Sequence, residues 1–91
     1  MQVRPIDIGS VVCSRAGRDA GRLFLVIGIL DEEFVLLADG DLRRAEKPKK
    51  KRRKHLSATS RKILQAEGIA RRGENFDNAQ IRSWLSNEEE Q

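Results

Sequence analysis

Six consecutive cations at residues 49–54, with the sequence KKKRRK, are the most distinctive chemistry in this 91-residue chain. Residues 47–62 carry nine Lys or Arg side chains and no Asp or Glu. The flanking segments, residues 1–46 and 63–91, have six basic against eight acidic and three basic against six acidic side chains. A surface selected only for solubility intersperses the two signs. The segregation therefore predicts a polyanionic partner for the basic run.

Three partners fit this run. RNA phosphates are favoured, and neutralising six of them predicts a slope of log affinity against log salt of about −4 to −5. A nuclear-import receptor would read KPKKKRRK in a eukaryotic cell. An acidic membrane is the third partner, but no lipidation site or apolar anchor adjoins the run, so we expect no membrane association. If the run is only a ligand surface, replacing residues 49–54 with Gln removes most RNA affinity and leaves the melting temperature nearly unchanged.

A second basic feature is the segment at residues 15–22, with the sequence RAGRDAGR. Gly17 and Gly21 permit the positive φ angles of a tight turn and let the backbone approach a ligand closely. The guanidinium groups of this segment can then reach phosphates. A solvated turn whose charges serve only solubility is the competing interpretation. Asp19 is expected to orient a neighbouring Arg.

The predicted RNA contacts combine both features with the residues that precede the run. They are Arg15, Arg18, Arg22, Arg43, Arg44, Lys47, Lys49, Lys50, Lys51, Arg52, Arg53, Lys54 and His55. Arg61, Lys62, Arg71 and Arg72 are candidates to extend this surface. With no Tyr and one Trp in the chain, stacking platforms for bases are few, so specificity is expected from RNA shape.

Catalysis and metal binding are not indicated. The chain offers no nucleophile–base pair, metal-ligand cluster or phosphate-cradling P-loop motif, so we expect no enzyme, metal or cofactor. His55 is the only histidine, and without nearby Cys residues it makes no metal site. It is expected to contact RNA or to end a strand. Cys13 is the only cysteine, which is expected to be structural and fits a reducing, cytoplasmic location.

Short β-strands must position these side chains. Strands are expected at residues 9–14, at 23–30 and at 34–38, the last two forming a hairpin with a bulge at Gly28. The Asp39-Gly40 pair predicts another tight turn, with a fourth strand from Leu42 toward Lys47. A short closing strand is expected at residues 55–57. Strands at this spacing without crossover helices predict a mainly β fold, a small closed barrel.

The C-terminal part reads as partly helical. One or two helical turns are expected at residues 60–66, and a helix at residues 77–87 with Asp77 as its N-cap. Ile81, Trp84 and Leu85 form one apolar stripe. Packing of this stripe onto the barrel is favoured, docking onto a protein partner is the alternative, and disorder in isolation is the third possibility. Glu88–Glu90 oppose the helix macrodipole, so the last turn is expected to fray.

The segment GSVVCSRAGRDAGR, residues 9–22, resembles the KOW motif, with Gly21 as its nearly fixed glycine. With the apolar strands up to residue 40 and the basic stretch ending in KHL, residues 6–63 resemble the archaeal and eukaryotic large-subunit ribosomal protein L fourteen-e family and its small bacterial relatives. The resemblance implies an SH3-like KOW barrel at residues 1–58 with a C-terminal extension at 59–91. It further implies a non-catalytic protein that binds ribosomal RNA and associates with the ribosome. We expect this protein to be a monomer in the cytoplasm.

A different class of function is the alternative that this resemblance leaves open. KOW barrels also occur in transcription elongation factors, where they bind polymerase. The chain would then be a protein-interaction module of the transcription or translation machinery, with the helix that carries Trp84 docking onto a protein. Binding to a protein partner that survives high salt would favour this alternative, whereas a steep salt dependence would favour RNA.

Overall fold

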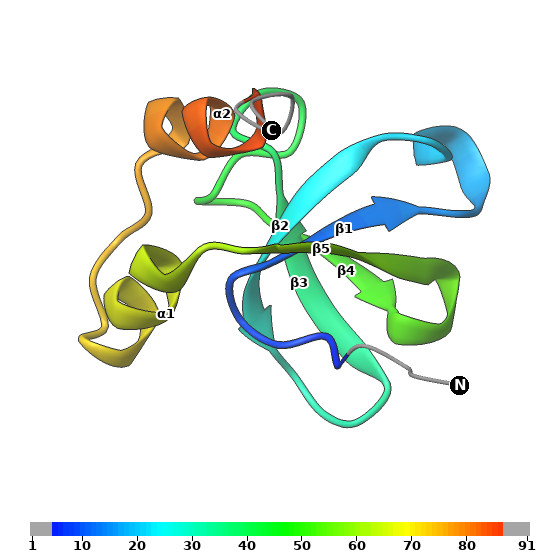
Figure 1. Cartoon of the computed structure of the whole chain (residues 1–91), viewed down its shortest axis with the longest axis horizontal. Helices are drawn as coiled ribbons and strands as arrows, with labels where there is room; N and C mark the ends of the chain where they lie inside the picture. The colour runs from blue at the N-terminus through cyan, green and yellow to red at the C-terminus, as the bar shows by residue number, and fades with distance from the viewer. Residues whose placement is uncertain (1–4, 87–91) are drawn as a thin grey trace.

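A computed structural model of the chain describes residues 5–86 (Figure 1). Five strands form one antiparallel sheet in the order β4-β3-β2-β1-β5, and two short helices follow. The chain is therefore mainly β, a small SH3-like barrel with C-terminal helices. The elements are β1 (Ser10–Ser14), a 3-10 turn η1 (Gly17–Asp19), β2 (Leu23–Ile29), β3 (Phe34–Ala38), β4 (Lys49–Arg52), a second 3-10 turn η2 (Arg53–His55), β5 (Leu56–Lys62), α1 (Leu64–Arg71) and α2 (Asn78–Ser86).

Both faces of the central strands are buried. Alternate side chains of a strand point to opposite faces, so Val11 and Val12 of β1 belong to different apolar clusters. The cluster inside the barrel comprises Val12, Phe24, Val26, Val35, Leu37 and Leu56. The second cluster lies under the helices and comprises Val11, Leu25, Ala38, Ile63, Ala66 and Ile81. Burial on both faces explains why the β2 sequence is apolar almost throughout.

The expected hairpin at residues 23–38 is confirmed as the antiparallel pair β2–β3. The predicted bulge is also present, since the register of this pair shifts between Val26 and Gly28. Gly28 lies opposite Leu36, and a Cβ atom at Gly28 would come within 3.0 Å of Leu36 Cδ1. Glycine therefore lets the Leu36 side chain lie across β2 at the bulge.

The expected fourth strand at residues 42–47 is wrong. These residues belong to a loop at 39–48, and the basic run itself supplies β4. Asp39 explains the difference, because its Oδ1 atom accepts hydrogen bonds from the backbone N–H groups of Asp41 and Arg43, both at 2.9 Å. Side-chain capture of two backbone donors stabilises a compact loop in place of a two-residue hairpin turn.

The expected helical turns at residues 60–66 are also placed wrongly, because β5 continues through Lys62 and α1 begins at Leu64. The strand is longer than its sequence suggests because its polar residues pair with β1, up to the Ser10–Lys62 pair. Thr59 Oγ1 donates to the Val11 carbonyl at 2.7 Å. The strand β5 thus runs through residue 58, the expected boundary between barrel and extension.

The predicted C-terminal helix is confirmed as α2, and it packs onto the sheet. Its N-cap is Asp77, whose Oδ1 accepts the Ala79 N–H at 2.9 Å. Ile81 is fully buried, and Trp84 and Leu85 pack against the same cluster. Packing of the apolar stripe onto the barrel is therefore confirmed. The Glu88–Glu90 segment, for which fraying is expected, lies outside the described residues. No helix within residues 5–86 has the length and apolar character needed to cross a membrane.

Candidate nucleic-acid interface

Strand β4 divides the basic run between two faces of the sheet. Lys49 and Lys51 pair with Leu37 and Val35, so they share the face of the barrel core. Lys51 Nζ donates to the Ala16 carbonyl at 3.3 Å, and Lys49 Nζ lies 3.7 Å from Asp19 Oδ2. Aliphatic stems of lysines can cover apolar surface while their ammonium groups reach polar partners. Half of the strand's cations thus contact partners within the protein while remaining partly exposed.

The other two cations of β4 lie on the outer face, over one aromatic ring. Lys50 Nζ is 4.5 Å and the Arg52 guanidinium carbon 5.0 Å from the centroid of Phe34. Arg52 also pairs with Glu33 of the β2–β3 turn. Cation–π contacts hold both heads near the ring, which leaves Lys50 exposed on the surface without an ion pair to any residue of the described part.

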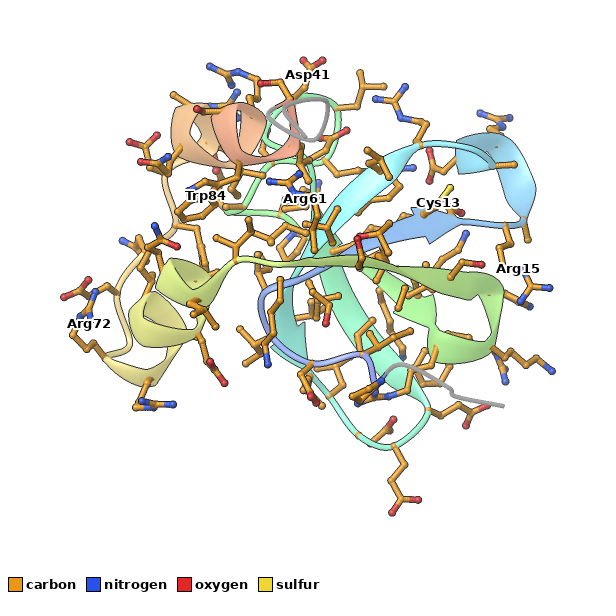
Figure 2. All side chains as sticks on the ribbon, in the orientation of Figure 1. Cys13, Arg15, Asp41, Arg61, Arg72 and Trp84 are labelled. Carbon is orange, nitrogen blue, oxygen red and sulfur yellow. The ribbon has the colours of Figure 1, made fainter. Side chains whose placement is uncertain are left out.

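The end of the run turns toward the glycine-containing segment at residues 15–22. In η2, Arg53 Nη1 donates to the Ile6 carbonyl at 2.6 Å, while Lys54 is exposed. The Arg15 N–H donates to the His55 carbonyl at 2.8 Å. This backbone hydrogen bond joins two basic segments that are forty residues apart in the sequence. Figure 2 shows Arg15 at the end of the barrel that is far from the helices.

The segment at residues 15–22 forms the tight turn expected of it. Gly17 and Gly21 have φ angles of 78° and 87°. Arg15 and Arg18 are exposed, but Arg22 is diverted to Asp39, with Nη2 and Oδ2 3.1 Å apart. The prediction that the two glycines shape a turn is confirmed. Of its three arginines, two point into solvent and one braces the 39–48 loop.

Asp19 is buried in this turn and pairs with two cations from distant segments, in place of the expected neighbouring arginine of its own loop. Its Oδ2 lies 3.5 Å from Arg43 Nη2 and 3.7 Å from Lys49 Nζ. One carboxylate therefore ties the β1–β2 turn to the 39–48 loop and to the first residue of β4. A paired buried carboxylate of this kind fixes geometry because its removal would leave its partners without counter-charge.

The remaining predicted cations lie on the 39–48 loop. Arg44 Nε is 3.1 Å from Glu46 Oε2, and Lys47 is exposed. The hydrogen bond from the Asn78 amide is the largest of several contacts that lower the pKa of Glu46 to about 2. Burial by itself would raise the pKa of Asp39, but hydrogen bonds from the backbone of Arg43 and Asp41 and from Arg22 outweigh it and lower the pKa. Both carboxylates thus stay ionised at neutral pH and hold the loop.

The only histidine and the only cysteine of the chain are both half-buried. His55 is half-buried, and its backbone carbonyl serves the hydrogen bond to Arg15. Cys13 is free and half-buried, with its Sγ 3.6 Å from the Ser14 carbonyl oxygen. Among the described residues, no group of three or more His, Cys, Asp or Glu side chains is placed to hold a metal ion.

The four cations considered as an extension of the surface lie elsewhere. Arg61 Nη2 donates to the Trp84 carbonyl at 2.8 Å and so caps the last turn of α2. Lys62 pairs with Glu67, and Arg72 pairs with Glu74. Figure 2 places Arg72 at the helical end of the molecule, opposite Arg15. Arg71 is exposed at the end of α1, so all four cations lie with the helices and do not continue the basic surface.

Sequence reasoning missed the two residues that organise the outer face of β4, Phe34 and Glu33. The available signal was the alternation of a strand, applied to a run of six like charges. Had the run been read as a strand, alternate cations would have been expected to face a neighbouring aromatic or acidic residue.

Comparison with known proteins places the chain in a family, although no protein-family model matches it. The large ribosomal subunit protein eL14 of Desulfurococcus amylolyticus is 36% identical over 65 residues, which cover 71% of this chain and 68% of that protein. The eL14 of Pyrobaculum arsenaticum is 34% identical over 61 residues, covering 67% and 59%, and that of Pyrobaculum calidifontis is 33% identical over 68 residues, covering 75% and 66%. The chain thus spans about three fifths to two thirds of the length of these relatives. On this similarity the chain belongs to the eL14 family of large ribosomal subunit proteins.

Proposed function

We propose that the protein is a non-catalytic RNA-binding protein that associates with the large ribosomal subunit. It contacts the phosphates of structured ribosomal RNA through one surface, the basic end. The basic end comprises the exposed or half-exposed cations Arg15, Arg18, Lys50, Arg52, Arg53 and Lys54. The single observation that carries the proposal is the Arg15 to His55 backbone hydrogen bond, because it joins the glycine-containing turn and the end of the basic run into one surface.

Charge supports phosphate contact at this end. Arg15, Arg18 and Lys54 are exposed and make no ion pair with another residue in the described range 5–86. Cations that lack internal counter-charge gain most when they replace the counterions condensed on a nucleic acid. The fixed turn holds two guanidinium groups, which suit the geometry of phosphate oxygens. Contacts to phosphates position a protein on RNA, and the shape of the RNA supplies the specificity.

Crosslinking to RNA in cells, followed by sequencing of the bound fragments, tests the proposal. We expect fragments of large-subunit ribosomal RNA to be enriched. The variant Arg15→Gln/Arg18→Gln/Lys54→Gln should lose this enrichment. A matched control, Lys62→Gln/Arg71→Gln/Arg72→Gln, removes the same charge from the helical end and should keep it. Recovery of messenger RNA at random, without ribosomal enrichment, would contradict the ribosomal assignment.

A further inference from the structure

A second concave basic surface lies beside the basic end, at the loop that precedes β4. It is a hollow of about 370 Å³ lined by Leu42, Arg43, Arg44, Lys47, Pro48 and Lys49. This volume is near the lower end of the roughly 300–1,000 Å³ range of small-ligand sites. Four of the six lining residues are cations and the other two are apolar, so the hollow combines a site for an anion with an apolar wall.

The loop that forms the hollow is held in place before any ligand arrives. Arg43 contributes its carbonyl to hydrogen bonds from the backbone N–H groups of Asp39 and Gly40, at 2.8 and 3.1 Å. From α2, Asn78 Oδ1 accepts the Ala45 N–H at 2.7 Å, and Arg82 Nη1 donates to the Gly40 carbonyl at 2.6 Å. A loop fixed from two sides loses little conformational entropy when it binds, which favours affinity.

The cations of the hollow are not equivalent. Arg43 and Lys49 share Asp19, which compensates part of their charge at the base of the loop. Lys47 is exposed and makes no ion pair with any other residue between 5 and 86, while Arg44 pairs with the exposed Glu46. The strongest uncompensated positive charge therefore lies at Lys47, where a phosphate can replace solvent as the partner.

The apolar wall has no partner of its own. Leu42 is 66% exposed, the second most exposed large apolar residue of the described chain, although both residues that follow it are arginines. A duplex presents mainly phosphates and sugars to a protein surface, whereas an unpaired nucleotide also presents the apolar face of its base. Leucine and proline beside cations therefore suit an unpaired nucleotide better than a regular helix.

We propose that this hollow binds one unstacked nucleotide of the RNA, with its phosphate at Lys47 and Arg44 and its base against Leu42 and Pro48. The proposal rests on the RNA-binding function proposed above. It adds a place where the protein distinguishes a bulge or loop from continuous duplex, and it gives α2 a role as the support of the loop.

The test uses the full chain and three RNA hairpins: one fully paired, one with a single unpaired nucleotide, and one whose unpaired nucleotide is abasic. We expect the intact bulge to bind about tenfold more tightly than the other two, the gain that burial of one leucine side chain supplies. Leu42→Ser should remove this preference without changing affinity for the fully paired hairpin. Leu30→Ser is the matched control, since Leu30 is a 50% exposed leucine in the β2–β3 turn, and it should keep the preference.

Each other result has a distinct meaning. Equal binding of the three hairpins by the unaltered protein overturns the nucleotide site and leaves RNA binding intact. Loss of preference in both leucine variants overturns it too, because the effect would not be local to the hollow. If a poly-glutamate peptide displaces the bulged hairpin equally well from Leu42→Ser and from the unaltered protein, the hollow is a general anion site. That result would overturn the nucleotide site. Failure to bind any of the hairpins would contradict the proposed RNA-binding function itself.

Discussion

At the scale of single residues, Asp19 decides how the charge of the basic run is distributed. Its carboxylate pairs with Arg43 and Lys49 and partly neutralises them, while Arg15 and Arg18, from the same turn as Asp19, are exposed. One buried acid thus separates structural cations from cations available to a ligand. A count of Lys and Arg residues in a sequence segment therefore overstates the charge available to a ligand, because buried acids pair with some of these cations.

At position 40, both the backbone conformation and close packing favour glycine. Its φ angle is 79°, and a Cβ atom there would overlap the Asn78 carbonyl and come within 3.0 Å of Arg82 Cγ. Gly40→Ala should therefore destabilise the protein by about 2–5 kcal/mol, combining the left-handed conformation with overpacking against α2. Gly21 is the control, since it has a φ of 87° with open space around it, and Gly21→Ala should cost only about 1–2 kcal/mol. Equal urea midpoints for the two variants would contradict a close contact between the loop and α2.

The lowered pKa of Asp39 predicts that the protein loses stability in acid. In the folded protein the pKa of Asp39 lies below the ordinary value of 3.8, because its hydrogen bonds outweigh the effect of burial, and that of Glu46 falls from 4.5 to about 2. An acid with a lowered pKa binds its proton more readily in the unfolded chain, so its contribution is complete above about pH 4.5 and is lost as pH falls toward 2. Urea unfolding between pH 7 and pH 2 should show this decline. Asp39→Asn should be less stable at neutral pH and lose less on acidification; an unchanged pH profile would exclude Asp39 as a contributor.

At the scale of elements, the parts of the fold that were predicted from sequence are those whose residues are intrinsically suited to strands. The β-branched and aromatic residues of β2 and β3 indicated a hairpin, and Gly28 indicated its bulge. The strand β4 could not be predicted in the same way, because Lys and Arg have low strand propensity and KKKR contains no alternation of residue type. Its alternation exists only in its neighbours, with the barrel core on one side and Phe34 on the other.

The candidate site, like the fold, was predicted only where local sequence determines its structure. The glycine-containing turn and its exposed arginines follow from local sequence. The assignment of Lys49 and Lys51 to the core face depends on pairing with β3, and the position of the 39–48 loop depends on Asn78 of α2, more than thirty residues away. Contacts of this range leave no signal in a single sequence, because any strand edge or helix could supply them.

From the contacts of β4 we expect its two faces to make separable contributions, which differs from the first expectation that replacing the whole run leaves the melting temperature nearly unchanged. Lys49→Gln/Lys51→Gln removes the inner contacts with Asp19 and Ala16 and should destabilise the protein by about 1–3 kcal/mol. Lys50→Gln/Arg52→Gln removes only surface contacts and should cost less than about 1 kcal/mol. RNA affinity should respond in the opposite order. Thermal melts and RNA titrations of both variants check this. A larger loss of stability from the outer pair would mean that the strand faces are assigned the wrong way round.

At the scale of the whole molecule, the fold separates the helices that stabilise the barrel from the surface proposed to contact RNA. The helices cover the face of the sheet that holds Val11 and Leu25, and Ile81 is buried among them. The basic turn and η2 lie at the other end of the barrel (Figure 1). Burial of both faces of the central strands leaves the loops, the strand ends and the exposed outer face of β4 as the surfaces for a ligand, and the charge is concentrated there. The C-terminal helices thus stabilise the barrel and, through the 39–48 loop, shape a surface that they do not themselves form.

This separation predicts the salt dependence of RNA binding more closely than the number of Lys and Arg residues in the basic run does. Outside the internal ion pairs of residues 5–86, the exposed cations near the basic end and the hollow are Arg15, Arg18, Lys47, Lys50 and Lys54. Counting only these five cations, which have no internal counter-charge, predicts a slope of log affinity against log salt of about −3.5 to −4.5. Arg15→Gln/Arg18→Gln/Lys54→Gln should make the slope shallower by about 2–3, because each lost contact contributes about 0.7–0.9.

The control for this measurement is Lys62→Gln/Arg71→Gln/Arg72→Gln, which changes the net charge equally at the helical end. Its slope should stay within the error of the unaltered protein, because counterion release depends on cations that touch phosphates and much less on the total charge. Titrations over a series of salt concentrations measure all three slopes. Equal shallowing in the two variants would show that net charge alone attracts the RNA and that the basic end has no special part. A slope near zero for the unaltered protein, with binding retained at high salt, would instead indicate an apolar docking surface and favour a protein-interaction module.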